Sequence, residues 1–269
     1  MAQPTTRRHV VRLLAGAALL AASGERVLAA RKTARKAALI GRLIAEARAL
    51  PRVSQRIDFI SHALLGVRYQ AHTLIGGPKH PERFVVRDDA FDCVTFCEVV
   101  LAAAIARDLD AFETSLRRIR YDHGKVQWDQ RNHYFAEWSR RNIENRICQP
   151  VVMQPSVTIE KNVSWHRALG KRHVSIVAVP RATLLQNAKS LSPGDIIGFI
   201  SRRSNLDFFH TGLVAFSGKG ALLLRHASRS RGRVIEESMA AFVTANPVKY
   251  VALLRALEPE APITAERKT

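Results

Sequence analysis

The chain has 269 residues, of which 47% are hydrophobic and 24% are charged, a globular composition that excludes a disordered chain or a fibrous repeat. No uninterrupted apolar stretch reaches the roughly 18 residues of a membrane-spanning helix, which excludes a polytopic membrane protein. The net charge of +19 indicates an anionic partner (nucleic acid, a membrane surface or an acidic wall polymer) or a solvated basic surface without a specific partner.

Residues 1–30 have the pattern of an export signal and are predicted to lie outside the fold. Arg7 and Arg8 precede a weakly hydrophobic segment at 13–23 that is too short to span a bilayer, and small residues close it at 27–30. The arginine pair resembles a twin-arginine signal, so we expect a periplasmic or extracytoplasmic location. The alternative is an ordinary basic N-terminal helix.

The rest of the chain changes from a helical pattern to a strand pattern near residue 150. Ser54 is the expected N-cap of the second helix, and Asp110 with Glu113 forms an expected capping box. The predicted helices cover 36–49, 54–66, 92–107, 110–120 and 133–145, with a loop at 71–82. The predicted strands cover 174–180, 195–201, 211–217, 221–228 and 249–257, with turns at 192–195 and 217–220 and short helices at 182–190 and 238–246.

Helices followed by strands predict an α+β fold, in which the N-terminal helices pack on one side of an antiparallel sheet. We expect a single domain over residues 31–256 and a flexible charged tail over 257–269. Three cysteines are too few for a disulfide scaffold, and the odd number leaves at least one thiol free.

A cysteine occupies the start of the predicted helix 92–107, in the segment FDCVTFCE. Asp92 is a good N-cap, which places Cys93 at the first helical position. Unpaired N–H groups and the helix dipole favour a thiolate there, so Cys93 is a candidate nucleophile. The alternative is that Cys93 is a small apolar core residue.

Two histidines lie on the two strands of a predicted hairpin. His210 opens an apolar strand in FFHTGLV, where an imidazole can act as general base and then as general acid in acyl transfer. His226 follows the turn at 217–220, and antiparallel pairing can bring it beside His210 to fix the tautomer of that ring. The sequence therefore predicts a Cys–His–His constellation.

Cys97 lies one helical turn after Cys93 and is expected to be the less activated thiol. It either packs in the core or pairs with Cys148 in an oxidising compartment. No second close pair of Cys or His completes a metal site with Cys93 and Cys97, so we expect neither a metal nor a cofactor.

Taken together, these motifs resemble a known family. FDCVTFCE followed by SPGDIIGF, HTGLV and RHAS is similar to the NlpC/P60 superfamily of papain-like cell-wall hydrolases. The block YDHGKVQWDQRNHYFAEW, and the T in place of SG in the cysteine motif, resemble its DUF1460 branch, the N-acetylmuramoyl-L-alanine amidase-like proteins. The resemblance runs from about Tyr69 to Ser228 and implies a papain-like fold with a longer helical N-terminal part.

The resemblance also implies a role for each matching residue. The nucleophile falls on Cys93, the general base on His210 and the residue that orients the base on His226. The RNHY block, with Arg131, His133 and Tyr134, is implied to be part of the substrate cleft. Arg87 and Arg131 are candidate clamps for substrate carboxylates, because arginine presents a planar donor fork.

The implied reaction is hydrolysis of the amide between N-acetylmuramic acid and L-Ala in small peptidoglycan fragments, through a thioester on Cys93. The expected partners are therefore stem peptides. No wall-binding SH3 or LysM repeat and no nucleic-acid partner are expected.

Three alternatives remain open. The same chemistry can cleave the D-Glu–diaminopimelate bond, as in many NlpC/P60 relatives. The Cys–His pair can instead transfer an acyl group to an amine. The net charge and the segment SRSRGR at 228–233 are also compatible with a non-catalytic basic protein that binds anionic envelope polymer or nucleic acid, although an aromatic content of 7% weakens RNA binding.

Overall fold

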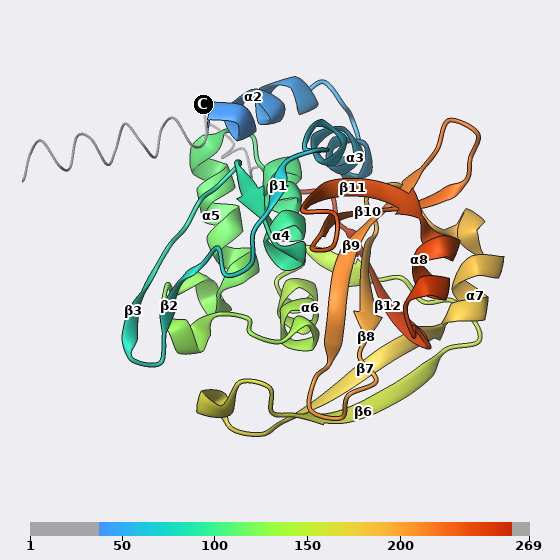
Figure 1. Cartoon of the computed structure of the whole chain (residues 1–269). Helices are drawn as coiled ribbons and strands as arrows, with labels where there is room; N and C mark the ends of the chain where they lie inside the picture. Colours follow the sequence, from blue (N-terminus) through green and yellow to red (C-terminus); the bar gives the residue numbers. More distant parts are fainter. Residues whose placement is uncertain (1–37, 260–269) are drawn as a thin grey trace, which may run out of the picture.

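The computed structural model describes residues 38–259, and Figure 1 shows a curved sheet with helices on both of its sides. The ten-stranded sheet has the order β4-β1-β11-β10-β9-β8-β12-β7-β6, and β5 pairs with β12. Neighbours are antiparallel except for β1 and β4, which are parallel. The strands are β1 Arg68–Tyr69, β4 Ala90–Phe91, β5 Cys148–Pro150, β6 Val157–Val163, β7 Arg172–Pro180, β8 Ile196–Ile200, β9 Phe208–Phe216, β10 Leu222–Ser228, β11 Arg233–Ser238 and β12 Tyr250–Ala256, with a separate hairpin of β2 Ile75–Gly77 and β3 His80–Arg83.

The helices of the described region confirm the change of pattern near residue 150. They are α2 Ala38–Ala47, α3 Val53–Ala63, α4 Cys93–Ile105, α5 Leu109–Arg120, α6 Phe135–Glu144, α7 Arg181–Gln186 and α8 Met239–Ala245. Short 3-10 turns occur at Asp122–Gly124, Trp128–Gln130, Arg167–Leu169 and Ala188–Ser190. The mixed helix-and-sheet class predicted from the sequence is therefore correct.

Helices cover both faces of the sheet, whereas the sequence predicted helices on one face only. In Figure 1, α2 to α6 lie on one side, and α7 and α8 lie on the other. Strand β8 shows the reason, since all five of its residues are buried. Ile196 and Ile200 belong to the core under α2 to α6, while Ile197 and Phe199 belong to a second core under α7 and α8. A continuous apolar run in a strand indicates burial on both faces.

Two of the predicted helix caps are wrong. Ser54 lies inside α3, which begins at Val53, and the N–H of Val53 instead donates to the carboxylate of Glu258 at 2.7 Å. Helix α5 is capped by Asp108, which accepts from the N–H of Ala111 at 2.8 Å, and not by Asp110. The acceptor for Val53 comes from the far end of the chain, so no local pattern could have indicated that contact.

The structure contains strands that the sequence did not predict. β6 and β11 carry charged residues on exposed positions and lack a long apolar run, and β5 has only three residues. The predicted loop at 71–82 contains most of the β2–β3 hairpin. These strands are specified by their pairing partners more than by their own composition.

The predicted export signal at 1–30 and most of the predicted tail, residues 260–269, lie outside the described residues. Within the tail, Leu257 and Glu258 are held, because the N–H of Leu257 donates to Ile147 and Glu258 pairs with Arg56. Between residues 38 and 259, no helix combines the length and apolar character needed to cross a bilayer.

A buried ion pair joins α4 to α5 in the core. The Arg120 Nε donates to Glu98 at 2.7 Å, and the Arg120 Nη1 donates to the carbonyl of Val85 at 2.7 Å. Both side chains are almost fully buried, with 2% and 3% exposure. Burial raises the pKa of Glu98, and the nearby guanidinium opposes this shift. The pair fixes the orientation of α4, whose first residue is Cys93.

We predict that Arg120→Met lowers the free energy of unfolding in urea by about 3–5 kcal/mol, because it leaves the Glu98 carboxylate buried without its partner. Arg140→Met is the matched control, since Arg140 pairs with Glu144 at the surface with both side chains more than half exposed. The control should lose less than about 1 kcal/mol. Equal losses in the two variants would contradict the prediction.

Candidate active site

The start of α4 has the cap that the sequence predicted. The Asp92 Oδ1 accepts from the N–H of Val94 at 3.1 Å and of Thr95 at 2.8 Å, and the Thr95 hydroxyl accepts from the N–H of Asp92 at 2.9 Å. Cys93 is the first helical residue, as expected. Its own N–H is not used by the Asp92 cap.

The first turn of α4 packs against strand β9. Cys97 is fully buried, with its sulfur 3.9 Å from the Thr211 hydroxyl, which in turn donates to the carbonyl of Ile197 at 2.8 Å. The backbone N–H of Thr211 lies close enough to the Cys93 thiol to lower the pKa of that thiol. Because Thr211 directly follows His210 in β9, this contact brings the nucleophile and the base that the sequence predicted into one site.

His210, His226 and Glu237 form a hydrogen-bonded chain across three adjacent strands. The His210 Nε2 lies 2.7 Å from the His226 Nδ1, and the His226 Nε2 lies 2.8 Å from the Glu237 Oε1. A carboxylate can only accept, so Glu237 sets the proton of His226 on Nε2 and that of His210 on Nε2. The His210 Nδ1 is then left as a free acceptor.

The expected proximity of the two histidines is therefore correct, but the sequence analysis did not identify Glu237. The sequence did contain a signal for such a carboxylate partner, because two adjacent glutamates, Glu236 and Glu237, follow Arg225 and His226 in the chain. In the β10–β11 ladder, Arg225 pairs with Glu236 and His226 with Ile235. The strand β11 itself was not predicted, so this register could not be used.

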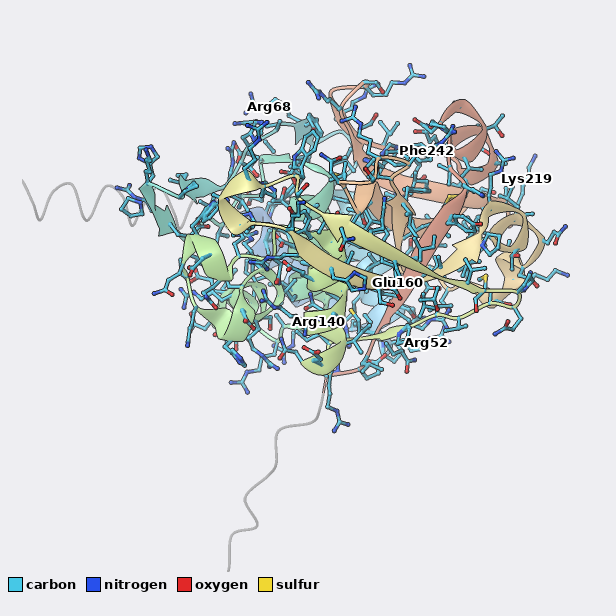
Figure 2. All side chains as sticks on the ribbon, turned by 90° about the horizontal axis from the view of Figure 1, so that it is seen from below. Arg52, Arg68, Arg140, Glu160, Lys219 and Phe242 are labelled. Atoms are coloured by element: carbon cyan, nitrogen blue, oxygen red, sulfur yellow. The ribbon has the colours of Figure 1, made fainter. Side chains whose placement is uncertain are left out.

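Aromatic side chains fix the orientation of both imidazoles. Phe242 of α8, labelled in Figure 2, has its ring centroid 5.5 Å from that of His210 and 5.5 Å from that of His226. Phe199 stacks on His210 at 6.1 Å. Gly212 leaves room for this arrangement, since a Cβ there would lie 2.9 Å from the His226 Cβ.

The expected thiolate at Cys93 is wrong for the resting site. Burial raises the pKa of Cys93 from an ordinary 9.0 to about 12, and the Asp92 carboxylate adds to the increase. The N–H groups of Thr211, Cys93 and Val94 lower this pKa, but by less. Removal of the sulfur from water therefore outweighs the helix start.

The imidazoles are neutral for the same reason. Burial lowers the pKa of His210 to about 3, and the neighbouring His226 contributes in the same direction. Burial also lowers the pKa of His226, although Glu237 opposes the change. At neutral pH the resting site therefore holds a neutral thiol on α4 and an unprotonated imidazole chain on the strands.

Tyr69 is a second residue of the site that sequence reasoning did not single out. The β1–β4 pairing places Tyr69 opposite Phe91, two residues before Cys93. Burial raises the pKa of Tyr69, the charges of Cys93 and Asp92 raise it further, and Arg229 opposes them. Tyr69 therefore keeps its proton beside the thiol and can donate a hydrogen bond there.

Arg131 is placed away from the histidine chain and is already paired. Its Nη1 donates to the Glu82 Oε1 at 3.0 Å, and the same oxygen accepts from the Tyr121 hydroxyl at 2.9 Å. The Glu82 side chain is 1% exposed, so the pair is largely internal. This arrangement gives Arg131 a structural partner in place of a free donor fork.

His133 and Tyr134 lie in an aromatic cluster. The His133 ring is 4.6 Å from Trp128 and 4.9 Å from His166, and its Nε2 is 2.6 Å from the carbonyl oxygen of Trp128. Burial lowers the pKa of His133 to about 4. The Tyr134 hydroxyl accepts from the N–H of His166 at 3.0 Å, and the side chain is buried. Both residues brace the loop that carries His166.

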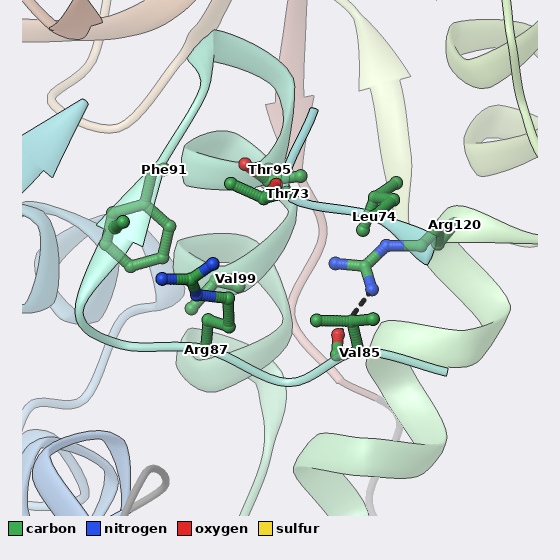
Figure 3. Close-up of a pocket in the computed structure, with 9 residues that line it drawn as sticks. Thr73, Leu74, Val85, Arg87, Phe91, Thr95, Val99 and Arg120 are labelled. Atoms are coloured by element: carbon green, nitrogen blue, oxygen red, sulfur yellow. Dashed lines mark hydrogen bonds between the residues drawn. The ribbon is translucent and has the colours of Figure 1, made fainter. Parts of the chain in front are cut away.

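Arg87 lies against a cavity of about 10 Å³, which is room for a single water. Figure 3 shows its side chain between Phe91 and Val99. The guanidinium donates twice to Asp89, at 2.9 Å each, and once to Gln70 at 3.3 Å. Neither Arg87 nor Arg131 lines the large groove beside His210.

That groove is the open side of the site. A hollow of about 650 Å³ is bordered by His210, His226 and Phe242, together with Arg229 and Arg231. The partly exposed side chain of Glu237 also borders this hollow. The histidine chain therefore faces a space large enough for a substrate.

All three cysteines are free, and Cys97 and Cys148 are buried in the core. Burial raises the pKa of both thiols, to about 12 for Cys148. Cys97 thus packs in the core, one of its two expected states. Over residues 38–259, no group of three or more His, Cys, Asp or Glu side chains is arranged to hold a metal ion.

Comparison with known proteins identifies the relatives of this chain. Residues 59–249 match the family described as AmiA-like, N-acetylmuramoyl-L-alanine amidase-like. No curated protein matches the chain.

Several solved structures are similar to this chain over most of its length. An N-acetylmuramoyl-L-alanine amidase from Bacteroides uniformis is 25% identical, with a TM-score of 0.68 over 77% of this chain and 99% of that chain. A second structure from that organism, with the same description, is 26% identical, again with a TM-score of 0.68 and the same coverage. Protein LPG0564 of Legionella pneumophila, of family DUF1460, is 19% identical and shares the fold, with a TM-score of 0.73 over 86% of this chain and 98% of that chain.

We predict that iodoacetamide modifies Cys93 in the folded protein at pH 8 more than about 10-fold more slowly than in the unfolded chain, because a pKa of about 12 leaves little thiolate. Cys97 and Cys148 should remain unmodified. Peptide mass spectrometry with and without urea measures all three rates. Faster labelling of Cys93 in the folded protein would contradict the assigned resting state.

Proposed function

We propose, from the premise that this chain belongs to the N-acetylmuramoyl-L-alanine amidase-like family and is an amidase-like enzyme, that Cys93 carries out its hydrolysis. The proposed reaction cleaves the amide between N-acetylmuramic acid and L-Ala in peptidoglycan fragments. The observation that carries the proposal is the hydrogen-bonded chain of His210, His226 and Glu237, which begins on the strand against which the helix that starts with Cys93 is packed.

The first half of the reaction forms a thioester. As the Cys93 sulfur attacks the amide carbonyl, the thiol proton passes to the His210 Nδ1, the acceptor that the Glu237–His226 chain leaves free. The C–S bond forms and the carbonyl oxygen becomes an oxyanion, toward which the Cys93 N–H and the Tyr69 hydroxyl can donate. His210 then gives the proton to the departing L-Ala nitrogen, and the C–N bond breaks.

The second half returns the enzyme to its starting state. A water gives a proton to the His210 Nδ1 as its oxygen attacks the thioester carbonyl. The C–S bond then breaks, the sulfur recovers the proton, and the lactyl carboxylic acid is released. His226 and Glu237 are positioning residues, because they touch neither substrate nor sulfur in this scheme and act through the orientation of His210.

The finer assignments belong to the same proposal. A cysteine at a helix start and a histidine on the packed strand support a papain-like NlpC/P60 arrangement over residues 31–256. The arginine pair and apolar segment within residues 1–30 support export to the periplasm. The nearest alternative is cleavage of the D-Glu–diaminopimelate bond by the same residues, since the chemistry at Cys93 would be unchanged.

We predict that Cys93→Ala abolishes hydrolysis of a defined disaccharide-tetrapeptide and leaves the fold intact, because only the nucleophile is removed. Cys97→Ala is the control: it should keep most of the activity and lose about 1 kcal/mol of stability, since the Cys97 side chain is fully buried. Mass spectrometry of the products and urea unfolding measure the two effects. Wild-type turnover by Cys93→Ala would exclude the proposal.

The same experiment decides which bond is cleaved. Release of the free disaccharide together with an intact tetrapeptide identifies the amidase. Products that keep L-Ala and D-Glu on the sugar would identify the endopeptidase instead, with the Cys93 chemistry retained.

We predict that the acidic limb of kcat/KM lies below pH 6.5. His210 can act as a base only while it is unprotonated, and burial lowers its pKa from 6.5 to about 3. Activity should therefore be lost on acidification only as the pH falls from 6.5 toward 3. A pH series on the wild type measures the limb, with unfolding followed at each pH to separate inactivation from loss of structure. A midpoint at or above pH 6.5 would contradict the assigned environment of His210.

A further inference from the structure

We infer that an arginine-lined groove beside His210 binds the carboxylates of the peptide part of the substrate. This inference rests on the proposed function and names the subsite that would select its substrate. The arginines concerned are Arg202, Arg203, Arg229 and Arg231. The sequence analysis noted the last two only as part of the basic segment at 228–233, and it did not assign any of the four to the substrate cleft.

Two adjoining hollows make up the groove. The hollow at His210 shares Phe209, Arg229 and Asn246 with a second hollow of about 630 Å³. The second hollow continues along Arg202 and Arg203 to Trp165. A ligand whose reacting group lies at His210 therefore has a path over Phe209 toward a basic wall.

The four arginines make no ion pair with a carboxylate among the described residues, although the structure contains many such pairs elsewhere. The Arg203 guanidinium lies 5.7 Å from the Trp165 ring centroid, over an aromatic face. By contrast, Arg87 is paired with the half-exposed Asp89, and Arg131 is paired with the buried Glu82. Among residues 38–259, the only carboxylate that borders the groove is that of Glu237, which is hydrogen-bonded to His226. The groove thus presents unneutralised positive charge.

The loop that carries Arg202 and Arg203 is held in place by a lysine. The Lys161 Nζ donates to three carbonyl oxygens of this loop, those of Ser201, Arg203 and Leu206, at 2.6 to 2.7 Å. At the end of the same loop, the Asp207 carboxylate accepts from the N–H of Ala136 at 2.8 Å. This wall of the groove is therefore preorganised.

The loop that carries Arg229 and Arg231 is also anchored. The Ser228 hydroxyl lies 3.2 Å from that of Ser230 and accepts from the N–H of Arg231 at 3.4 Å. The carbonyl of Gly232 accepts from the N–H of Tyr69 at 2.8 Å, which ties the loop to the residue beside the thiol. Arg229 is close enough to Tyr69 to lower its pKa. This pair of arginines lies nearest the reacting bond.

These features fit an extended peptide with two or more carboxylates better than a neutral sugar chain. Guanidinium groups recognise carboxylates through paired N–H donors, and several such contacts along a groove set both affinity and direction. Phe209 and Trp165 are exposed between them and offer apolar contact to the rest of the ligand.

The test measures binding of L-Ala-D-Glu-diaminopimelate-D-Ala, and of the same tetrapeptide with its side carboxylates amidated, to Cys93→Ala protein by calorimetry. Two double variants are made in that background, Arg229→Gln/Arg231→Gln and Arg202→Gln/Arg203→Gln. The matched control is Lys219→Gln/Arg107→Gln. Lys219 projects from the turn at the opposite end of β9 from His210 (Figure 2), and Arg107 lies beyond the opposite end of α4 from Cys93.

We expect each groove variant to raise the Kd of the free tetrapeptide about 10-fold or more, with a change of less than twofold for the amidated peptide and for the control protein. Equal affinity in groove variants and control would overturn the inference, as would equal losses for the two peptides. In the active background, groove variants that keep the KM of the disaccharide-tetrapeptide would likewise overturn it. Absence of turnover in the wild type, with the binding differences present, would instead remove the proposed function and leave the subsite standing.

Discussion

The contact between the first turn of α4 and strand β9 is the constraint on which the site depends. Thr211 is hydrogen-bonded to β8 through its hydroxyl, faces the buried Cys97 and directs its N–H at Cys93. A displacement of the helix by one turn, about 5.4 Å, would separate the sulfur from the strand that carries His210. Cys97 and the Glu98–Arg120 pair prevent this displacement from within the core.

Burial and the helix start have opposite effects on the thiol, and their magnitudes decide the outcome. The rise in the pKa of Cys93 from 9.0 to about 12 corresponds to about 4 kcal/mol, whereas charge stabilisation at a helix end is typically about 0.3–1 kcal/mol and at most about 2 kcal/mol. The resting pair is therefore neutral. The helix start matters when charge develops on the substrate oxygen, because its N–H groups are already in position and need no reorganisation.

Local signals predicted the parts of the site that local sequence controls. The Asp92 cap, the turn at 217–220 and the position of His226 each depend on a few neighbouring residues, and the structure has all of them. Glu237 and Tyr69 were missed because they enter the site through pairing of strands far apart in the chain. The groove arginines lie on irregular loops, where no periodicity marks which side chains converge. Arg87 and Arg131 were predicted as carboxylate clamps because a sequence does not show that a guanidinium is already paired with a carboxylate of the same chain.

The order of strands in the sheet has a consequence for the chain as it matures. The proposed nucleophile is carried by the early helix α4, whereas the proposed base, its orienting ring and the carboxylate lie on β9, β10 and β11, more than a hundred residues later. A partly synthesised or truncated polypeptide that ends at β8 would contain Cys93 but lack the His210–His226–Glu237 chain. Under the proposed mechanism, hydrolysis therefore depends on completion of the tertiary structure, and an incomplete copy of the chain would be inactive.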